Sequence, residues 1–139
     1  MRLGRREKGT GIKEKNKMEL YCKKCNQKLT KGPLSQAKVS SINHGDEKDL
    51  VPLHQYVFLA EAEYNFEIPI DFLVNNKSLN LDNHTESIRL QGCCGPSEFG
   101  QLNQICPNCK SEIGLLIDDC WTPRFIAIDS NKISKKPLW

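Results

Sequence analysis

Two Cys-x-x-Cys pairs, separated by eighty residues, constrain the fold of this chain more than any other feature. The first pair is Cys22 and Cys25, and the second is Cys106 and Cys109. A Cys-x-x-Cys turn presents two thiolates on one edge of a tetrahedron, and two such turns complete the four-sulfur shell that zinc accepts. The sequence therefore predicts one structural zinc ion, bound by all four cysteines and left with no open coordination position.

The compartment of the protein bears on how its cysteines are interpreted. The chain has 139 residues, of which seven are cysteine and 38% are hydrophobic. The first residues are basic but lack the apolar core of a secretory signal. The sequence also contains no run of about eighteen apolar residues, the length needed to span a membrane. We therefore expect a cytoplasmic protein with no membrane contact, whose reduced cysteines bind metal. A metal ion would also supplement a thin core.

The charge is divided unevenly along the chain. Residues 1–17 contain seven Lys/Arg and two Glu, whereas the remainder contains thirteen basic and fifteen acidic residues. The slightly acidic remainder argues against nucleic acid as a partner. We expect residues 1–17 to form a disordered basic arm and residues 18–139 a single zinc-binding β domain. Apolar residues begin at Met18, so a translation start there is a hypothesis that the intact mass of the native protein would test.

After Met18 the pattern is typical of strands and turns. Strands are predicted at residues 20–22, 53–62, 64–74, 112–117 and 124–129, with a short helix as the alternative for 53–62. An asparagine-capped helical turn is predicted within 75–81, and a short extended piece at 87–90. Residues 64–74 alternate apolar and polar side chains, and Pro69 places that strand at a sheet edge or a bulge. The predicted architecture is mainly β: a small zinc-knuckle, zinc-ribbon-like domain with a long insertion between its knuckles.

Three further cysteines lie outside the two pairs: Cys93 and Cys94 in GCCGP, and Cys120 in DDCW. They could be thiols packed in turns, ligands of a second metal, or a redox pair between Cys120 and one of the tandem cysteines. Consecutive side chains diverge, so adjacent cysteines make poor joint ligands. Asp118 and Asp119 should raise the pKa of the Cys120 thiol, which disfavours a reactive thiolate there.

The three histidines give little indication of catalysis. His44 and His84 lie in polar, loop-like stretches and are expected to be solvated, whereas His54 lies in a predicted apolar strand and is expected to be structural. If the domain has a ligand pocket, we expect Trp121, Phe125 and the GCCGP turn to line it.

Both knuckles resemble those of the β-tent group of zinc proteins. YCKKCNQKL is similar to the first knuckle of that group, and ICPNCKSEIGLLIDD to the second. The group includes B-type methionine-R-sulfoxide reductases, Yippee proteins and cereblon-type ligand-binding domains. The resemblance covers roughly thirty residues and implies two sheets held together by zinc. It therefore supports a prediction of the fold more strongly than a prediction of the function.

The comparison with the reductases can be made residue by residue. Cys120 follows the second knuckle and Cys93 or Cys94 precedes it, which matches the order of the catalytic and resolving cysteines. The Arg-x-Cys-x-Asn segment of those enzymes is absent, as is the histidine that they carry just after the second knuckle. We therefore expect a non-catalytic structural-zinc module that binds an unidentified protein or small ligand. The alternatives are a thiol-dependent oxidoreductase using Cys93, Cys94 and Cys120, and nucleic-acid binding through residues 1–17.

Overall fold

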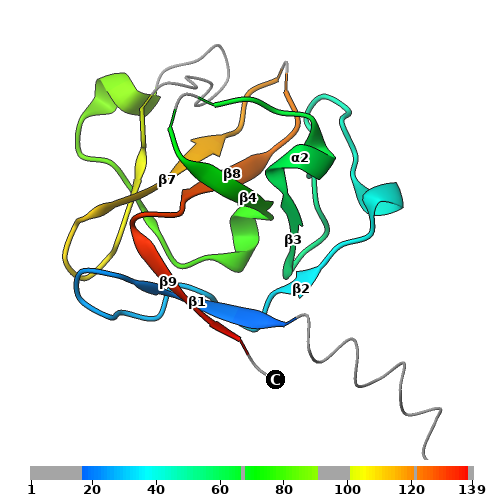
Figure 1. Ribbon diagram of the computed structural model, residues 1–139. Helices are drawn as coiled ribbons and strands as arrows, with labels where there is room; N and C mark the ends of the chain where they lie inside the picture. Colours follow the sequence, from blue (N-terminus) through cyan, green and yellow to red (C-terminus); the bar gives the residue numbers. More distant parts are fainter. Residues whose placement is uncertain (1–16, 67, 91–100, 121, 138–139) are drawn as a thin grey trace, which may run out of the picture.

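The computed structural model describes residues 17–66, 68–90, 101–120 and 122–137 (Figure 1). In chain order its elements are β1 (Met18–Cys22), β2 (Ser35–Gln36), η1 (Val39–Ser41), β3 (Gln55–Phe58), α2 (Leu59–Ala62), β4 (Ile70–Val74), η2 (Asn76–Ser78), β5 (Asp82–Asn83), η3 (Ser87–Leu90), β6 (Gln104–Ile105), β7 (Glu112–Ile117), β8 (Phe125–Asp129) and β9 (Ile133–Pro137). The three η elements are single 3-10 turns. The predicted division into an arm of residues 1–17 and a domain of residues 18–139 stays a prediction, because residues 1–16 lie outside the described residues.

Strands dominate the described residues and form two sheets. The smaller sheet pairs β1 with β9, and the larger has the order β2-β3-β4-β8-β7-β6-β5. Within these sheets β2 and β3 run parallel, whereas the other neighbouring strands are antiparallel. Figure 1 shows the β1–β9 ribbon along one side of the larger sheet. The predicted mainly β fold, with a long insertion between the cysteine pairs, is confirmed.

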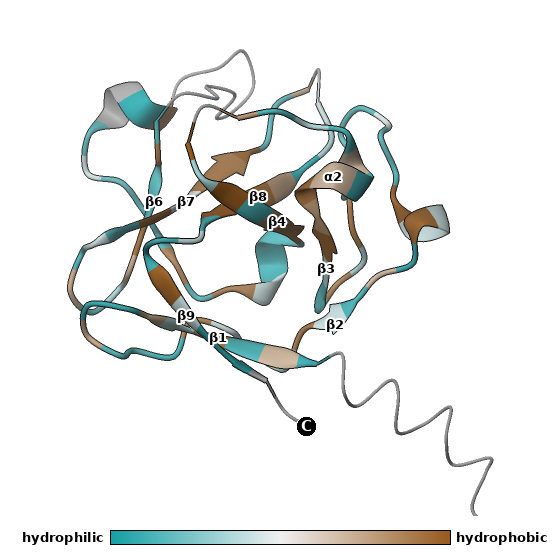
Figure 2. Cartoon of the chain, in the orientation of Figure 1, coloured by the Kyte–Doolittle hydropathy of each residue, from teal (hydrophilic) through white to brown (hydrophobic). Residues whose placement is uncertain are grey.

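The centre of the larger sheet is buried on both faces. On β8 all five residues are buried, with Ile126 and Ile128 on one side and Phe125 and Ala127 on the other. The first side packs against Leu20 of β1 and its neighbours, so one apolar cluster joins the two sheets. Figure 2 shows the resulting concentration of hydrophobic residues in β4, β7 and β8. Such strands carry nearly continuous apolar runs because neither face meets water.

The asparagine-capped turn predicted within residues 75–81 is confirmed. The Asn75 side chain accepts a hydrogen bond of 2.8 Å from the backbone N–H of Lys77, the first step of η2. Asparagine is favoured at such caps because its short side chain reaches an otherwise unpaired N–H group. The Asn75 amide also donates to the carbonyl oxygen of Val51, which ties the turn to the core.

The strand predicted for residues 64–74 is shorter and more central than expected. Strand β4 begins at Ile70, directly after Pro69, and lies between β3 and β8, so the predicted edge position is wrong. Proline has no N–H to donate to a ladder, and here it precedes the strand. The register between β4 and β8 shifts between Ile70 and Phe72, just after Pro69, which agrees with the bulge predicted there as the alternative. Phe66 and Ile68, outside the strand, still pack against the core.

Two other segments combine or change their predicted form. Residues 53–62 contain both predicted alternatives, the strand β3 followed by the short helix α2, where the Glu61 side chain accepts a hydrogen bond from the backbone N–H of Phe58. The segment Ser87–Leu90 is a 3-10 turn and not an extended piece, and an ion pair of 2.7 Å joins Arg89 to Glu86. In both segments a local side-chain interaction stabilises a turn that periodicity does not reveal. None of the helices in the described part of the chain is long and apolar enough to cross a membrane.

Candidate metal centre

Among the described residues, the four cysteines of the two pairs form one compact cluster. Their sulfur atoms all lie within 4.8 Å of one another. Cys22 Sγ is 3.6 Å from Cys109 Sγ, and Cys25 Sγ is 3.6 Å from Cys106 Sγ. Zinc–sulfur bonds of about 2.3 Å in a regular tetrahedron place neighbouring sulfurs about 3.8 Å apart. The cluster therefore has the donor set and the size of a four-thiolate metal site.

The first knuckle is closed by two backbone hydrogen bonds. The N–H of Cys22 donates to the carbonyl oxygen of Gln27 at 2.8 Å, and the N–H of Asn26 donates to the carbonyl oxygen of Cys22 at 2.8 Å. Asn26 has a positive φ of 64°, which lets the chain reverse directly after Cys25. Asparagine is among the residues that enter this left-handed region most readily.

The second knuckle repeats this arrangement at the same offsets. The N–H of Cys106 donates to the carbonyl oxygen of Ser111 at 2.9 Å, and the N–H of Lys110 donates to the carbonyl oxygen of Cys106 at 3.0 Å. Lys110 has a φ of 67°, close to that of Asn26. The two turns are thus structural equivalents, as their shared Cys-x-x-Cys pattern predicts.

The cluster lies where the two sheets meet. The first knuckle continues β1 of the small sheet, whereas the second connects β6 to β7 in the large sheet. Cys22 and Cys106 are fully buried, while Cys25 and Cys109 are partly exposed. A metal ion held by all four sulfurs would therefore join the sheets covalently through its ligands.

The thiols of the cluster differ in acidity. A hydrogen bond from the Asn108 side chain, helped by the backbone N–H of Gln27, lowers the pKa of Cys25 to about 6. Burial raises the pKa of the Cys106 thiol to about 11. Asn108 occupies an inner position of the second Cys-x-x-Cys turn and was not among the site residues predicted from the sequence. The donor capacity of an asparagine at that position was the available signal.

The three remaining cysteines lie outside this cluster or outside the described residues. Cys120 follows β7, and its backbone N–H donates to the Asp119 carboxylate at 2.7 Å. Cys93 and Cys94 lie outside the described residues, and so does Trp121. Phe125, the other predicted pocket residue, is fully buried in the core, with its ring centroid 4.9 Å from that of Tyr64. The predicted ligand pocket therefore stays a prediction, with Phe125 serving as core.

The side chain of His84 was predicted to be solvated, but it is largely buried. Its Nε2 atom lies 3.0 Å from a carboxylate oxygen of Glu112, its Nδ1 atom accepts from the backbone N–H of Glu86, and its side chain is only 10% exposed. Arg89 binds the same Glu112 oxygen at 2.9 Å. This network braces the segment between β5 and β6 against the start of β7, so the histidine is structural.

The other two histidines are also placed by the structure. His44 is exposed, as expected, although its Nε2 atom lies 3.0 Å from the carbonyl oxygen of Ala62. His54 is not in a strand; it lies in a turn before β3 with a φ of 61°. Its Nδ1 atom is buried without a hydrogen-bond partner among the described residues, while its backbone N–H donates to the Ser78 hydroxyl. The predicted strand position of His54 is therefore wrong, whereas its structural role stays a prediction.

Comparison with known proteins adds no relative. No family model matches the chain, and neither the curated proteins nor the solved structures contain a match. The function proposed below depends on the geometry of this chain and on the chemistry of its side chains.

Proposed function

We propose that Cys22, Cys25, Cys106 and Cys109 bind one zinc ion, and that the domain so stabilised is a non-catalytic binding module for a protein or small ligand. The observation that carries this proposal is the set of four sulfur atoms within 4.8 Å of one another. Zinc is the favoured metal because paired Cys-x-x-Cys turns with four thiolates are the usual structural zinc arrangement. Iron accepts the same shell and is the alternative that a metal count must separate.

The role of the ion would be to hold two sheets together. Because Cys22 ends β1 and Cys106 precedes β7, four metal–sulfur bonds link segments eighty residues apart. Binding free energy of a structural zinc site appears directly as folding free energy, since the unfolded chain has no preformed site. The resemblance of both knuckles to those of β-tent proteins supports the same arrangement.

The shell argues against chemistry at the metal itself. A catalytic zinc keeps one position for water or substrate, whereas four cysteines fill the tetrahedron. We therefore place any activity of the protein in binding, with the partner still to be identified.

The metal content of the purified chain tests the proposal. We expect one zinc per chain by elemental analysis, and loss of that zinc together with cooperative unfolding in Cys106→Ser. The matched control is Cys120→Ser, which removes a thiol outside the cluster and should retain the zinc. Iron in place of zinc, or full metal retention in Cys106→Ser, would contradict the proposal. Two zinc ions per chain would instead bring in Cys93, Cys94 or Cys120.

The oxidoreductase alternative requires a different measurement. A redox thiol reacts quickly with alkylating reagents at neutral pH because it is partly ionised. We expect Cys93, Cys94 and Cys120 to label slowly in the folded, metal-loaded protein. Fast labelling of any of the three would favour the thiol enzyme over the binding module.

A further inference from the structure

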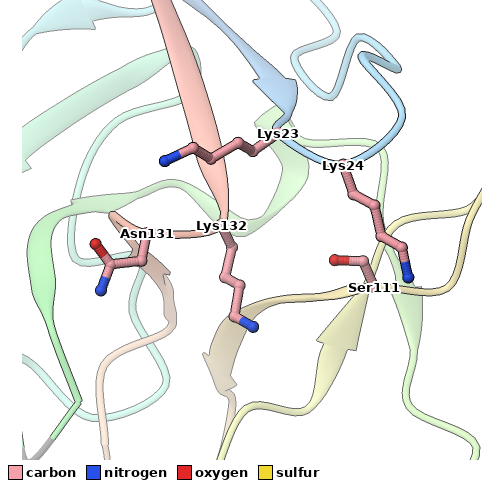
Figure 3. A pocket seen from close by; sticks show the side chains of 5 residues that line it. All are labelled: Lys23, Lys24, Ser111, Asn131 and Lys132. Carbon is pink, nitrogen blue, oxygen red and sulfur yellow. The ribbon is translucent and has the colours of Figure 1, made fainter.

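A pocket of about 210 Å³ opens beside the four-cysteine cluster. It is lined by Lys23, Lys24, Ser111, Asn131 and Lys132 (Figure 3). In Figure 3 the side chains of Lys24 and Lys132 extend on either side of Ser111. Every lining side chain carries an N–H or O–H donor, and no carboxylate is among them.

The walls of the pocket come from three segments that the fold fixes in place. Lys23 and Lys24 are the inner residues of the first knuckle, and Ser111 closes the second. Asn131 and Lys132 form the turn between β8 and β9. The backbone N–H of Lys23 donates to the carbonyl oxygen of Lys132 at 3.0 Å, which joins the first knuckle to that turn.

The turn itself is held by Asp129. Its side chain accepts a hydrogen bond from the backbone N–H of Asn131 at 2.9 Å, and its carbonyl oxygen accepts from the N–H of Lys132 at 3.0 Å. Asp129 is buried, so its carboxylate stabilises the turn from the interior of the protein. The pocket is therefore bounded by backbone that is held by hydrogen bonds on each side.

The three ammonium groups of the pocket are not matched by neighbouring carboxylates. Among the described residues, ion pairs link Lys28 to Glu19 and Lys110 to Asp82, but none involves Lys23, Lys24 or Lys132. A zinc ion with four thiolates carries a net charge of about −2, which three lysines exceed by one unit. If the three lysines neutralise the charge of the metal centre, a net positive charge of about one unit remains in the pocket.

We propose that this pocket binds a phosphate group. Three lysines, a serine and an asparagine line one small open space, and charge-assisted hydrogen bonds from such groups are the strongest that an oxyanion can accept. Lysine serves as a compact point charge in such sites. The proposal rests on the proposed metal centre, because Lys23, Lys24 and Ser111 are positioned by the two knuckles that the metal joins.

The surroundings extend the positive charge beyond the pocket. Residues 17–31 and 130–137, which contain the paired strands β1 and β9, together carry eight lysines and one glutamate. The chain after residue 17 is slightly acidic on average, but these two segments form a basic region within it. The phosphate could belong to a small free phosphate compound or to the phosphodiester backbone of a nucleic acid, and the experiment separates these two sources.

The test uses the full chain with its metal content measured on the same sample. Inorganic phosphate and a single-stranded oligonucleotide are titrated separately, and the amide resonances of Lys24, Ser111 and Asn131 are followed by NMR. The test variant is Lys23→Ala/Lys132→Ala. The control variant Lys38→Ala/Lys48→Ala removes the same charge from exposed residues outside the pocket.

We expect inorganic phosphate to shift the three pocket amides, with about a tenfold loss of affinity in the test variant and little change in the control. A phosphodiester source predicts tighter binding of the oligonucleotide and a salt slope flatter by about 1.4 in the test variant, since each lysine–phosphate contact contributes about 0.7. A free-phosphate source predicts that the oligonucleotide binds no more tightly than inorganic phosphate.

Two results would overturn the pocket: no amide shift with either ligand, or equal losses in the test and control variants. Its failure is distinguishable from failure of the metal centre. One zinc per chain without phosphate binding would refute the pocket alone, and phosphate binding at the same amides without zinc would refute the metal centre alone.

Discussion

Asn26 and Lys110 share the same left-handed backbone conformation, with φ angles of 64° and 67°, each directly after the second cysteine of its pair. The N–H of each residue also donates to the carbonyl oxygen of the first cysteine of its pair. Residues with a Cβ atom adopt it at a cost, which is smaller for asparagine than for lysine. The two knuckles therefore have the same geometry but carry different amounts of backbone strain.

Replacing Lys110 with glycine should stabilise the protein. Glycine enters the left-handed region without steric cost, so Lys110→Gly should raise the free energy of unfolding by about 1 kcal/mol. Asn26→Gly should give a smaller gain. The ion pair of Lys110 with Asp82, at 3.7 Å between largely exposed side chains, contributes little that would be lost. Thermal denaturation of the metal-loaded variants checks both values.

The matched control for these variants is Lys77→Gly. Lys77 is an exposed lysine without a positive φ, so glycine there should destabilise the protein by several tenths of a kcal/mol. Equal effects of glycine at Lys77 and Lys110 would show that the left-handed turn carries no strain.

The cysteine cluster could be predicted from the sequence because its signal is local. Spacing within each Cys-x-x-Cys pair fixes the turn, and the preference of a metal ion for four thiolates predicts that the two turns meet despite the eighty residues between them. Strands β7 and β8 could also be predicted from the sequence, because their apolar runs reflect burial on both faces of the sheet. In each case a few neighbouring residues contain the whole pattern.

The elements that escaped prediction depend on partners distant in the chain. Strand β9 has the polar sequence ISKKP and exists because its backbone pairs with β1, more than a hundred residues earlier. Strand β5 has two residues, too few to show a period. The lysine pocket likewise joins three segments that only the fold brings together. Such features follow from tertiary contacts, which outweigh local propensity.

Gly114 lies where a side chain has no room. A Cβ atom there would be 2.9 Å from the carbonyl oxygen of Ala127 and 3.0 Å from Cγ2 of Ile126, on the neighbouring strand β8. Gly114→Ala should therefore lower the free energy of unfolding by about 2 kcal/mol, because backbone on the partner strand must shift. Chemical denaturation of the metal-loaded protein measures this value.

Gly32→Ala is the control for this steric effect. Its added Cβ would meet no atom nearer than 3.7 Å, an ordinary contact with His54. We expect a change within about 0.5 kcal/mol. If both alanine variants lose the same stability, crowding at Gly114 is not the cause.

Asn103 joins the segment before β6 to the middle of β7. It is fully buried, its side-chain oxygen accepts a bond of 2.6 Å from the N–H of Leu116, and its amide donates to the Leu116 carbonyl oxygen at 3.0 Å. Asn103→Ala would leave both backbone groups without their partner, at a cost of about 2–3 kcal/mol. The exposed Asn80 provides the control, since Asn80→Ala should change stability little. Equal unfolding midpoints in urea for the two variants would refute this role.

The acidity of the cluster predicts how metal binding depends on pH. With a pKa of about 6, Cys25 is already a thiolate at pH 7.5 in the metal-free protein, whereas Cys106, with a pKa of about 11, is protonated. Zinc must displace the Cys106 proton, so zinc affinity should rise with pH and fall on acidification. Chelator competition between about pH 6.5 and 8.5 measures this trend, and a pH-independent affinity would contradict it.

Asn108→Ala isolates the cause of the low pKa of Cys25. Because the Asn108 side chain stabilises the thiolate by a hydrogen bond, its removal should raise that pKa toward the ordinary thiol value and reduce the thiolate fraction at neutral pH. Because a ligating cysteine must be deprotonated, Asn108→Ala should weaken zinc binding several-fold at about pH 7, and the loss should shrink at about pH 9, where an ordinary thiol is largely ionised. Chelator competition at the two pH values gives the comparison. An equal loss at both would indicate a general structural change in place of a lost hydrogen bond.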